Sequence, residues 1–370
     1  HTEGSDPYHR SRRTSDGQIH SGSLRASVDR NGTVHFVFRA PGAHSVAVQG
    51  LGGAFSERIP LYRQENGDWT GTAEGLPAGF HYHDISSMAH VCAMIAPIGY
   101  GDFRAINYFE IPDADSGFYL LQDVPHGTVR MDYYNSTVTG RYRTCFVYTP
   151  PGYETHPEKH YPVLYLQHGG GETETGWIWQ GKVNYIMDNL IAAGQCQEMI
   201  LVMNDGYAFC RTQASHPGRG AIDLVLAKDA FRSLTKNTVL SRTAEPAPLP
   251  DFHGGFQAQA AALHFPELFA SAGLFSCYFI IKDHYDDYTE LFSDARRFNE
   301  LFDLFFFSTG TEESNFYEQN LRTVQHLKEL GIDITYFETP GYHDWQVWRH
   351  SFRAFVTKLF RPFSSCNSFE

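Results

Sequence analysis

Three separated stretches of the sequence carry residue types that could together transfer an acyl group. Glu312 and Glu313 follow an apolar, strand-like run, and His343 lies in a loop just before the last helical pattern. In one known arrangement the nucleophile comes first, in a G-x-S-x-G turn between a strand and a helix, and is followed along the chain by the acid and the histidine. Gly254 and Gly255 fit the end of such a turn and lead into an alanine-rich helical pattern, but the central residue of the turn is Phe252. A phenyl ring has no atom that attacks a carbonyl, so the sequence predicts an acid and a base without their nucleophile.

The segment that leads into Phe252 also differs from a working turn. Prolines 246, 248 and 250 remove three backbone donors from a segment that should be a central strand. A working turn needs a small residue two positions before the nucleophile, but Pro250 holds that place, and Phe252 fits a positive φ poorly. We therefore expect the strand to be displaced or paired on one side only, and the acyl pocket to be collapsed or filled.

Other groups could replace the missing serine. Ser276 follows the apolar run that ends at Phe275, and Ser308 precedes the acidic loop. Asp251 could act as a carboxylate nucleophile. Each would have to lie within hydrogen-bond reach of His343. The acids have a second interpretation as well, because Glu312 or Glu313 could simply cap the next helix.

Composition narrows the class of protein. The chain has 370 residues, 42% hydrophobic and 15% aromatic, which is enough for two folded domains. Its net charge of −13 argues against nucleic-acid binding, and no apolar run reaches the roughly 18 residues of a membrane span. The six cysteines show no CxxC spacing and the 19 histidines form no metal-binding pattern, so we expect no metal and no cofactor. The cysteines are expected as buried or free thiols, with one disulfide as the alternative.

Hydrophobic periodicity divides the chain into three parts. Residues 1–20 are polar and are predicted to form a loose N-terminal arm. Residues 21–117 alternate with period two, as in Val34–Phe38 and Asp68–Thr72, and predict an immunoglobulin-like β-sandwich. From 118 to 370, apolar strand runs alternate with amphipathic helices, which predicts a mostly parallel sheet with helices on both faces.

The N-terminal part resembles the carbohydrate-binding module of the glycogen-branching-enzyme type. The stretches that carry the resemblance are FVFRAPGAHSVAVQG, GDWTGTAEGLPAGFHYH and YFEIP. The resemblance implies a glycan-binding surface, on which Trp69 would be a stacking platform unless it belongs to the core. The family's Asp-Gly turn after the last hairpin strand is replaced here by 85–90, so contact with a glycan at that place is not implied.

The remainder is similar to the feruloyl and acetylxylan esterases of carbohydrate esterase family one. The similarity rests on PVLYLQHGGGETETGW, VNYIMDNLIAAG, ILVMNDGYA, FNELFDLFFFSTGTEE and PGYHDWQVWRHSF. It implies an α/β-hydrolase fold, with His343 as the histidine, Glu313 rather than Glu312 as the acid, and Phe252 in the place of the serine. It also implies backbone oxyanion donors at Gly169, Gly170 and His253.

Three functions are compatible with these residues. In the first, the chain is a catalytically impaired relative of a xylan-directed esterase that still binds xylan or a hydroxycinnamoyl ester, through the N-terminal module and through the cleft aromatics Trp177, Trp179 and Trp345. In the second, it is an active carboxylic ester hydrolase with a different nucleophile. In the third, it is a structural partner domain of another glycan-degrading protein. The resemblance and the initial residue, His1 in place of Met, make a secreted or periplasmic location the expectation.

Overall fold

The structure is a computed structural model. It describes residues 24–87, 98–101, 103–209, 220–230, 253–282, 286–314 and 316–360. The predicted N-terminal arm, Phe252, Asp251 and the three prolines before them lie outside the described residues.

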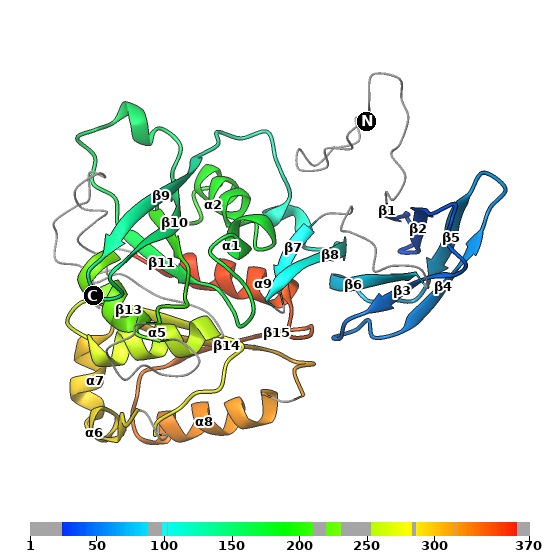
Figure 1. Ribbon diagram of the computed structural model, residues 1–370. Coiled ribbons are helices and arrows are strands. Elements are labelled where there is room, and N and C mark those ends of the chain that lie inside the picture. Colours follow the sequence, from blue (N-terminus) through cyan, green and yellow to red (C-terminus); the bar gives the residue numbers. More distant parts are fainter. Residues whose placement is uncertain are drawn as a thin grey trace, which may run out of the picture.

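The N-terminal part is an all-β domain (Figure 1). Its strands are β1 (Leu24–Val28), β2 (Val34–Arg39), β3 (Val46–Gly50), β4 (Arg58–Arg63), β5 (Asp68–Ala73), β6 (Gly79–Ser87), β7 (Ile98–Gly101) and β8 (Arg104–Ile111). They are hydrogen-bonded in the order β1-β2-β5-β4-β3-β6-β8-β7, and every pairing is antiparallel. The alternating side chains of β2 and β3 meet those of β8 in one apolar core, as in the edge-to-face contact of Phe36 with Phe109.

Trp69 belongs to this core. Its side chain is buried, and its indole Nε1 donates to the carbonyl oxygen of Ala40 at 2.9 Å. Of the two roles that the sequence left open, the structure places Trp69 in the core, because the ring and its polar atom are both satisfied inside the domain.

The α/β part begins at β9 (Thr128–Ser136), after the short 3-10 helix η1 (Ser116–Tyr119). A four-stranded sheet has the order β11-β12-β10-β9, with β10 (Arg141–Thr149), β11 (Val163–Gln167) and β12 (Ile200–Asn204). A parallel three-stranded sheet follows, with β13 (Ser271–Phe275), β14 (Leu304–Gly310) and β15 (Thr335–Thr339). The first sheet is mixed, because β10 is antiparallel to both neighbours, so the described strands are less uniformly parallel than the sequence predicted.

Helices cover both sheets (Figure 1). They are α1 (Gly176–Trp179), α2 (Val183–Ala192), α3 (Ile222–Val225), α5 (His253–His264), α6 (Thr289–Ser293), α7 (Ala295–Leu301), α8 (Tyr317–Glu329) and α9 (Trp345–Val356), with the short helices η2 (Tyr153–Thr155) and η3 (Leu226–Ala230). Helix α5 packs against both β11 and β13 and so joins the two sheets. The strand expected between these sheets would come from residues just before α5, which are not described.

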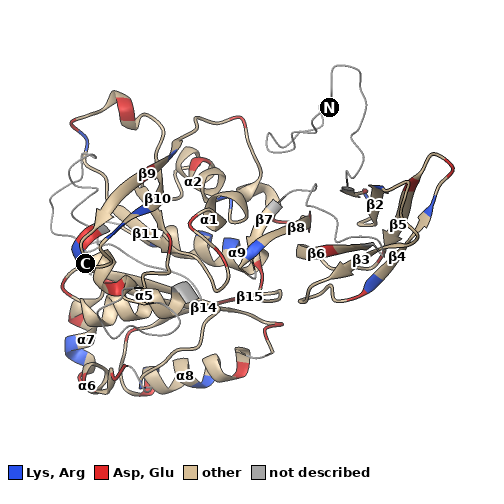
Figure 2. Ribbon diagram, viewed as in Figure 1, with Lys and Arg blue, Asp and Glu red and all other residues tan. Residues whose placement is uncertain are grey.

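The two parts of the chain share a packed interface. Phe80 of β6 lies in the same buried cluster as Trp345 and Phe352 of α9. Acidic and basic residues are interspersed along the ribbon of both parts (Figure 2). None of the described helices has the length and apolarity needed to cross a membrane.

Candidate active site

The predicted acid and histidine lie together at one edge of the three-stranded sheet. Glu313 follows β14 and His343 follows β15, and these strands are parallel neighbours, so their carboxyl ends meet. Oε2 of Glu313 lies 3.6 Å from Nδ1 of His343; the glutamate side chain is fully buried, whereas the histidine side chain is 33% exposed. The imidazole stacks on Phe316 and meets Trp348 edge-on, each with ring centroids 5.1 Å apart. The 3.6 Å separation is longer than a hydrogen bond, so the carboxylate lies beside Nδ1 of the imidazole at ion-pair distance only.

The second oxygen of Glu313 is held by Ser276. Ser276 Oγ donates to Glu313 Oε1 at 2.6 Å, and the serine is fully buried. The backbone of Ser276 has φ of 48°, an uncommon value for a residue with a side chain. Its hydroxyl therefore holds the carboxylate oxygen that does not face His343.

Glu312 has a different role. Its Oε2 accepts hydrogen bonds from the backbone N–H of Gly341 and from the Thr311 hydroxyl. These contacts tie the loop after β14 to the loop that carries His343. Of the two glutamates, Glu313 is the one that the structure places against the imidazole.

The other two candidate nucleophiles are Ser308 and Asp251. Ser308 is fully buried inside β14. Asp251 lies outside the described residues. Neither Ser276 nor Ser308 is exposed to a substrate in this structure.

Helix α5 starts where the sequence predicts a helix after the nucleophile turn. Its first residue is His253, whose predicted oxyanion role concerns a backbone N–H; only the helical backbone of this residue is described. A Cβ on Gly255 would lie 2.5 Å from Sγ of Cys277, so the glycine allows α5 to lie close against the residues that follow β13. The helix is in place, and the residue directly before it in the sequence is Phe252.

The glycine-rich turn after β11 is engaged in internal hydrogen bonds. The backbone N–H of Gly169 donates to Glu172 Oε2 at 3.1 Å, and that of Gly171 donates to the Tyr207 hydroxyl at 2.6 Å. His168 Nε2 accepts from the backbone of Gly206 at 2.8 Å. In this structure the N–H of Gly169 therefore points at a side chain and not at an acyl oxygen, whereas Gly170 is exposed at the tip of the turn.

Comparison of the sequence with known proteins gives two matches of different extent. Residues 136–219 match the Esterase family, described as "Putative esterase". An "Endo-1,4-beta-xylanase/feruloyl esterase" of Xylanibacter ruminicola is 31% identical over 349 residues, 90% of this chain and 46% of that protein. The chain thus spans less than half the length of this curated relative.

Solved structures agree on the fold. A ferulic acid esterase from Anaeromyces mucronatus, solved with ferulic acid, is 22% identical and superposes with a TM-score of 0.56 over 67% of this chain and 95% of that one. The α/β part has an esterase fold. An enterobactin esterase from Shigella flexneri is 14% identical, with a TM-score of 0.63 over 91% of this chain and 96% of that one, so the likeness extends across the β-domain.

Of the three tryptophans predicted to line a cleft in the esterase-like domain, two are buried and one is exposed. Trp177 and Trp345 are fully buried and pack perpendicular to each other, with centroids 5.1 Å apart. Their indole N–H groups donate to the Gln167 carbonyl and to the Tyr82 hydroxyl. They offer no face to a ligand in this structure, because core packing uses their rings and internal partners use their polar atoms. Trp179 is 44% exposed.

An exposed aromatic cluster lies beside the glycine-rich turn and was not predicted. It consists of Phe103, Tyr207 and Phe209, with Phe103 70% and Phe209 49% exposed. The Tyr207 centroid is 5.7 Å from Phe103 and 6.2 Å from the nearly parallel ring of Phe209. Phe103 has φ of 58°, and its backbone N–H donates to the Gly171 carbonyl at 2.9 Å.

Sequence reasoning could have found part of this cluster. Tyr207 and Phe209 follow β12 at its carboxyl end, where parallel sheets bind ligands. Phe103 gave no signal, because it comes from the other domain, in the turn between β7 and β8.

The β-domain also supports the helix that follows His343. Arg349 of α9, fully buried, forms a two-pronged ion pair with Glu110 of β8 at 3.0 and 3.2 Å, and Lys182 Nζ lies 2.8 Å from the same carboxylate. Burial by itself would raise the pKa of Glu110, but the two cations outweigh it and lower the pKa to about 2. The charge of Glu110 therefore holds α9 against the β-domain.

Proposed function

We propose that this chain is an esterase-related protein that binds a plant cell-wall ligand, xylan or a hydroxycinnamoyl ester, and has lost most of its hydrolytic activity. The observation that carries the proposal is the identity of Phe252, which directly precedes helix α5. That is the position of the nucleophile in an esterase fold, and phenylalanine cannot form an acyl-enzyme.

The surrounding residues support this proposal. Ser276 is committed to Glu313, and Ser308 is buried in a strand, so neither is presented to a substrate. The hydrogen bond of Gly169 to Glu172 removes one backbone donor from a developing oxyanion. Glu313 and His343 then lie together without a nucleophile to activate.

Binding is supported by the aromatic cluster of Phe103, Tyr207 and Phe209. Exposed rings of this kind present flat apolar faces to a phenolic ring or to the C–H face of a sugar. The residues sit beside the glycine-rich turn, at the edge of the sheet where an esterase fold receives its substrate. A polysaccharide ligand cannot cross a membrane, so a secreted or periplasmic location is part of the proposal.

The catalytic half of the proposal is tested with the unmodified protein. It is incubated with methyl ferulate, with acetylated xylan and with a fluorophosphonate probe, and a feruloyl esterase with a catalytic serine serves as the positive control. Because loss of a catalytic serine costs on the order of a million-fold in turnover, we expect no labelling and no hydrolysis above background. Labelling would overturn the proposal.

A second candidate is an active carboxylic ester hydrolase with a different nucleophile. The observation in its favour is the proximity of Glu313 and His343, whose Oε2 and Nδ1 lie 3.6 Å apart, a separation that substrate binding could shorten to a hydrogen bond. If the probe does label the protein, mass spectrometry of the labelled peptide identifies the residue, and a His343→Ala variant then loses the labelling.

The proposal that the aromatic cluster binds the ligand predicts a loss of affinity in Phe103→Ala. We expect the affinity for a feruloylated arabino-oligosaccharide to fall by about three- to tenfold, the equivalent of one aromatic contact. Isothermal titration calorimetry measures it. Tyr133→Ala is the matched control, because Tyr133 of β9 is 64% exposed outside the cluster. Equal affinities of both variants would remove the cluster from the binding site.

A further inference from the structure

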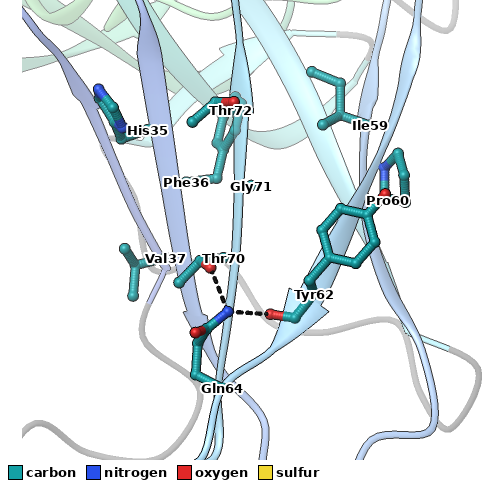
Figure 3. Close-up of a pocket in the computed structure, with 10 residues that line it drawn as sticks. All are labelled: His35, Phe36, Val37, Ile59, Pro60, Tyr62, Gln64, Thr70, Gly71 and Thr72. Carbon is teal, nitrogen blue, oxygen red and sulfur yellow. Dashed lines mark hydrogen bonds between the residues drawn. The ribbon is translucent and has the colours of Figure 1, made fainter.

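The β-domain meets the esterase-like domain along its inner side. Its outer side carries a groove lined by residues of β2, β4 and β5 (Figure 3), and β4 and β5 lie at the far side of the molecule (Figure 1). The inner side is formed by β6 and β7, which contact α9 and α1. Helix α9 directly follows the loop of His343, and α1 follows the glycine-rich turn at 168–171. The inner side therefore lies against the helices that leave both loops of the candidate site.

One residue of β6, Tyr82, places its hydroxyl inside the esterase-like domain. This oxygen accepts hydrogen bonds from Nε2 of Gln180 and from the indole Nε1 of Trp345, the second at 3.2 Å. Gln180 follows α1, Trp345 is the first residue of α9, and both side chains are fully buried. Gln180 is fixed by β7 as well, because its Oε1 accepts from the backbone N–H of Tyr100 at 2.8 Å. The phenol of Tyr82 thus joins the β-domain to the ends of two helices.

These two donors fix the direction of the Tyr82 proton. A phenol oxygen accepts up to two hydrogen bonds and donates one. Because Gln180 and Trp345 take the acceptor positions, the proton is left for a third partner, and Oε1 of Glu172 lies 3.5 Å from the phenol oxygen. Burial and the charge of Glu172 raise the pKa of Tyr82 well above its ordinary value, so the phenol keeps its proton at neutral pH. Tyr82 therefore acts as a hydrogen-bond donor to Glu172.

Glu172 connects this hydroxyl to the glycine-rich turn. Its side chain is buried, and its second oxygen, Oε2, accepts from the backbone N–H of Gly169 at 3.1 Å. A Cβ on Gly169 would lie 3.2 Å from the same oxygen, so the backbone of the turn runs close against the carboxylate. One carboxylate thus binds a hydroxyl of the β-domain on one side and, on the other, the backbone donor for which the sequence predicted an oxyanion role.

We propose that Tyr82 is a positioning residue, through which the β-domain holds the carboxylate of Glu172 against the N–H of Gly169 and keeps the glycine-rich turn in its present conformation. The β-domain then has a role inside the candidate site that needs no ligand of its own. The same hydroxyl holds Trp345, two residues after His343, so one group fixes both loops of the site. The role of Tyr82 is independent of whether the chain hydrolyses esters.

Amide hydrogen exchange at Gly169 tests this role in the full chain. The protein is labelled with ¹⁵N-glycine, the Gly169 resonance is assigned by its absence in Gly169→Ala, and its exchange is followed by NMR. In Tyr82→Phe the ring still packs edge-on against Phe80, with centroids 5.0 Å apart, but Glu172 loses a donor. We expect exchange at Gly169 to become about tenfold faster, and its amide proton to move upfield as the bond to the carboxylate weakens.

Two further variants separate positioning from a general loosening of the domain interface. The matched control is Tyr119→Phe, which removes another hydroxyl of this interface, bound to Oε1 of Gln346 at 3.2 Å, and should leave the Gly169 resonance unchanged. Gln180→Met keeps both Tyr82 and Glu172 but opens one acceptor position of the phenol, so the proton is no longer directed to Glu172. We expect a smaller rise in exchange at Gly169 than in Tyr82→Phe.

Several results would overturn the role of Tyr82. One is equal exchange at Gly169 in Tyr82→Phe and the unmodified chain, and another is an equal rise in the control Tyr119→Phe. If Tyr82→Phe does not fold, Gln180→Met decides, and unchanged exchange at Gly169 in that variant overturns the proposal. Fluorophosphonate labelling of the unmodified chain would overturn the impaired-enzyme proposal and leave the role of Tyr82 standing, so the two failures are distinguishable.

Discussion

Glu110→Gln should destabilise the protein by about 3–5 kcal/mol, because it leaves the buried guanidinium of Arg349 without a counter-charge. The amide retains the shape of the carboxylate, so the loss reports charge rather than packing. Arg349 also lies over the ring of Tyr119, 4.7 Å from its centroid, and donates to the Gln180 carbonyl at 3.0 Å. Neither contact supplies negative charge.

The pH dependence of this loss has a defined direction. The pKa of Glu110 is lowered from 4.5 to about 2 by Arg349 and Lys182, which outweigh its burial. A lowered pKa in the folded state gives stabilisation that is present above about 4.5 and lost as the pH falls through about 2. The difference between the wild-type protein and Glu110→Gln should therefore be largest near neutral pH and shrink below pH 4.5.

Urea unfolding at several pH values measures this difference, and Asp84→Asn is the matched control. Asp84 of β6 pairs with Arg104 of β8 at 2.7 Å, but both side chains are more than one third exposed. Such a pair contributes about 0–1 kcal/mol. A loss in Glu110→Gln no larger than that in the control, or one independent of pH, would contradict a stabilising charge at the domain interface.

The sequence predicted most elements of the fold because period and length are local signals. The alternation in 34–38 predicted β2, and the alternation of apolar runs with amphipathic patterns from 118 onward predicted the α/β part. The strand β4 gave no such signal, since RIPLYR has charged ends and an internal proline. It forms because Leu61 reaches the core while its neighbours point to solvent, which is a consequence of pairing with β3.

Residues of the site that lie at the ends of neighbouring strands could be predicted from their order along the chain. Residues whose position depends on partners far away in the sequence could not. The Glu313–His343 pair follows from two loops at the ends of parallel strands. The burial of Trp345 depends on a hydrogen bond to Tyr82 of the other domain. The direction in which the Gly169 N–H is engaged depends on the position of the Glu172 carboxylate. No local pattern reports such contacts, so aromatic residues near a predicted cleft could not be divided into core and surface.

Restoring the serine alone should not restore activity. We expect Phe252→Ser to remain unlabelled by fluorophosphonate, because Pro250 stays two residues before the apex, where the strained turn needs a small residue. The double variant Pro250→Gly with Phe252→Ser places a hydroxyl directly before α5 and relieves that restriction. With Glu313 and His343 already paired, we expect labelling and measurable hydrolysis of methyl ferulate to appear in the double variant only.

The rate of methyl ferulate hydrolysis in the double variant separates two causes of inactivity, the missing nucleophile and the engaged oxyanion donor. A complete triad raises turnover by up to about a million-fold, but the oxyanion contribution of a single donor is worth about a hundred- to a thousandfold. Because the N–H of Gly169 is bound to Glu172, the double variant should fall short of a working esterase by about that factor. Adding Glu172→Ala would then raise the rate further, whereas adding Glu174→Ala, which removes a carboxylate bound to Thr144, should not. Labelling of Phe252→Ser by itself would show that Pro250 is no obstacle, and that the side chain at position 252 alone accounts for the loss.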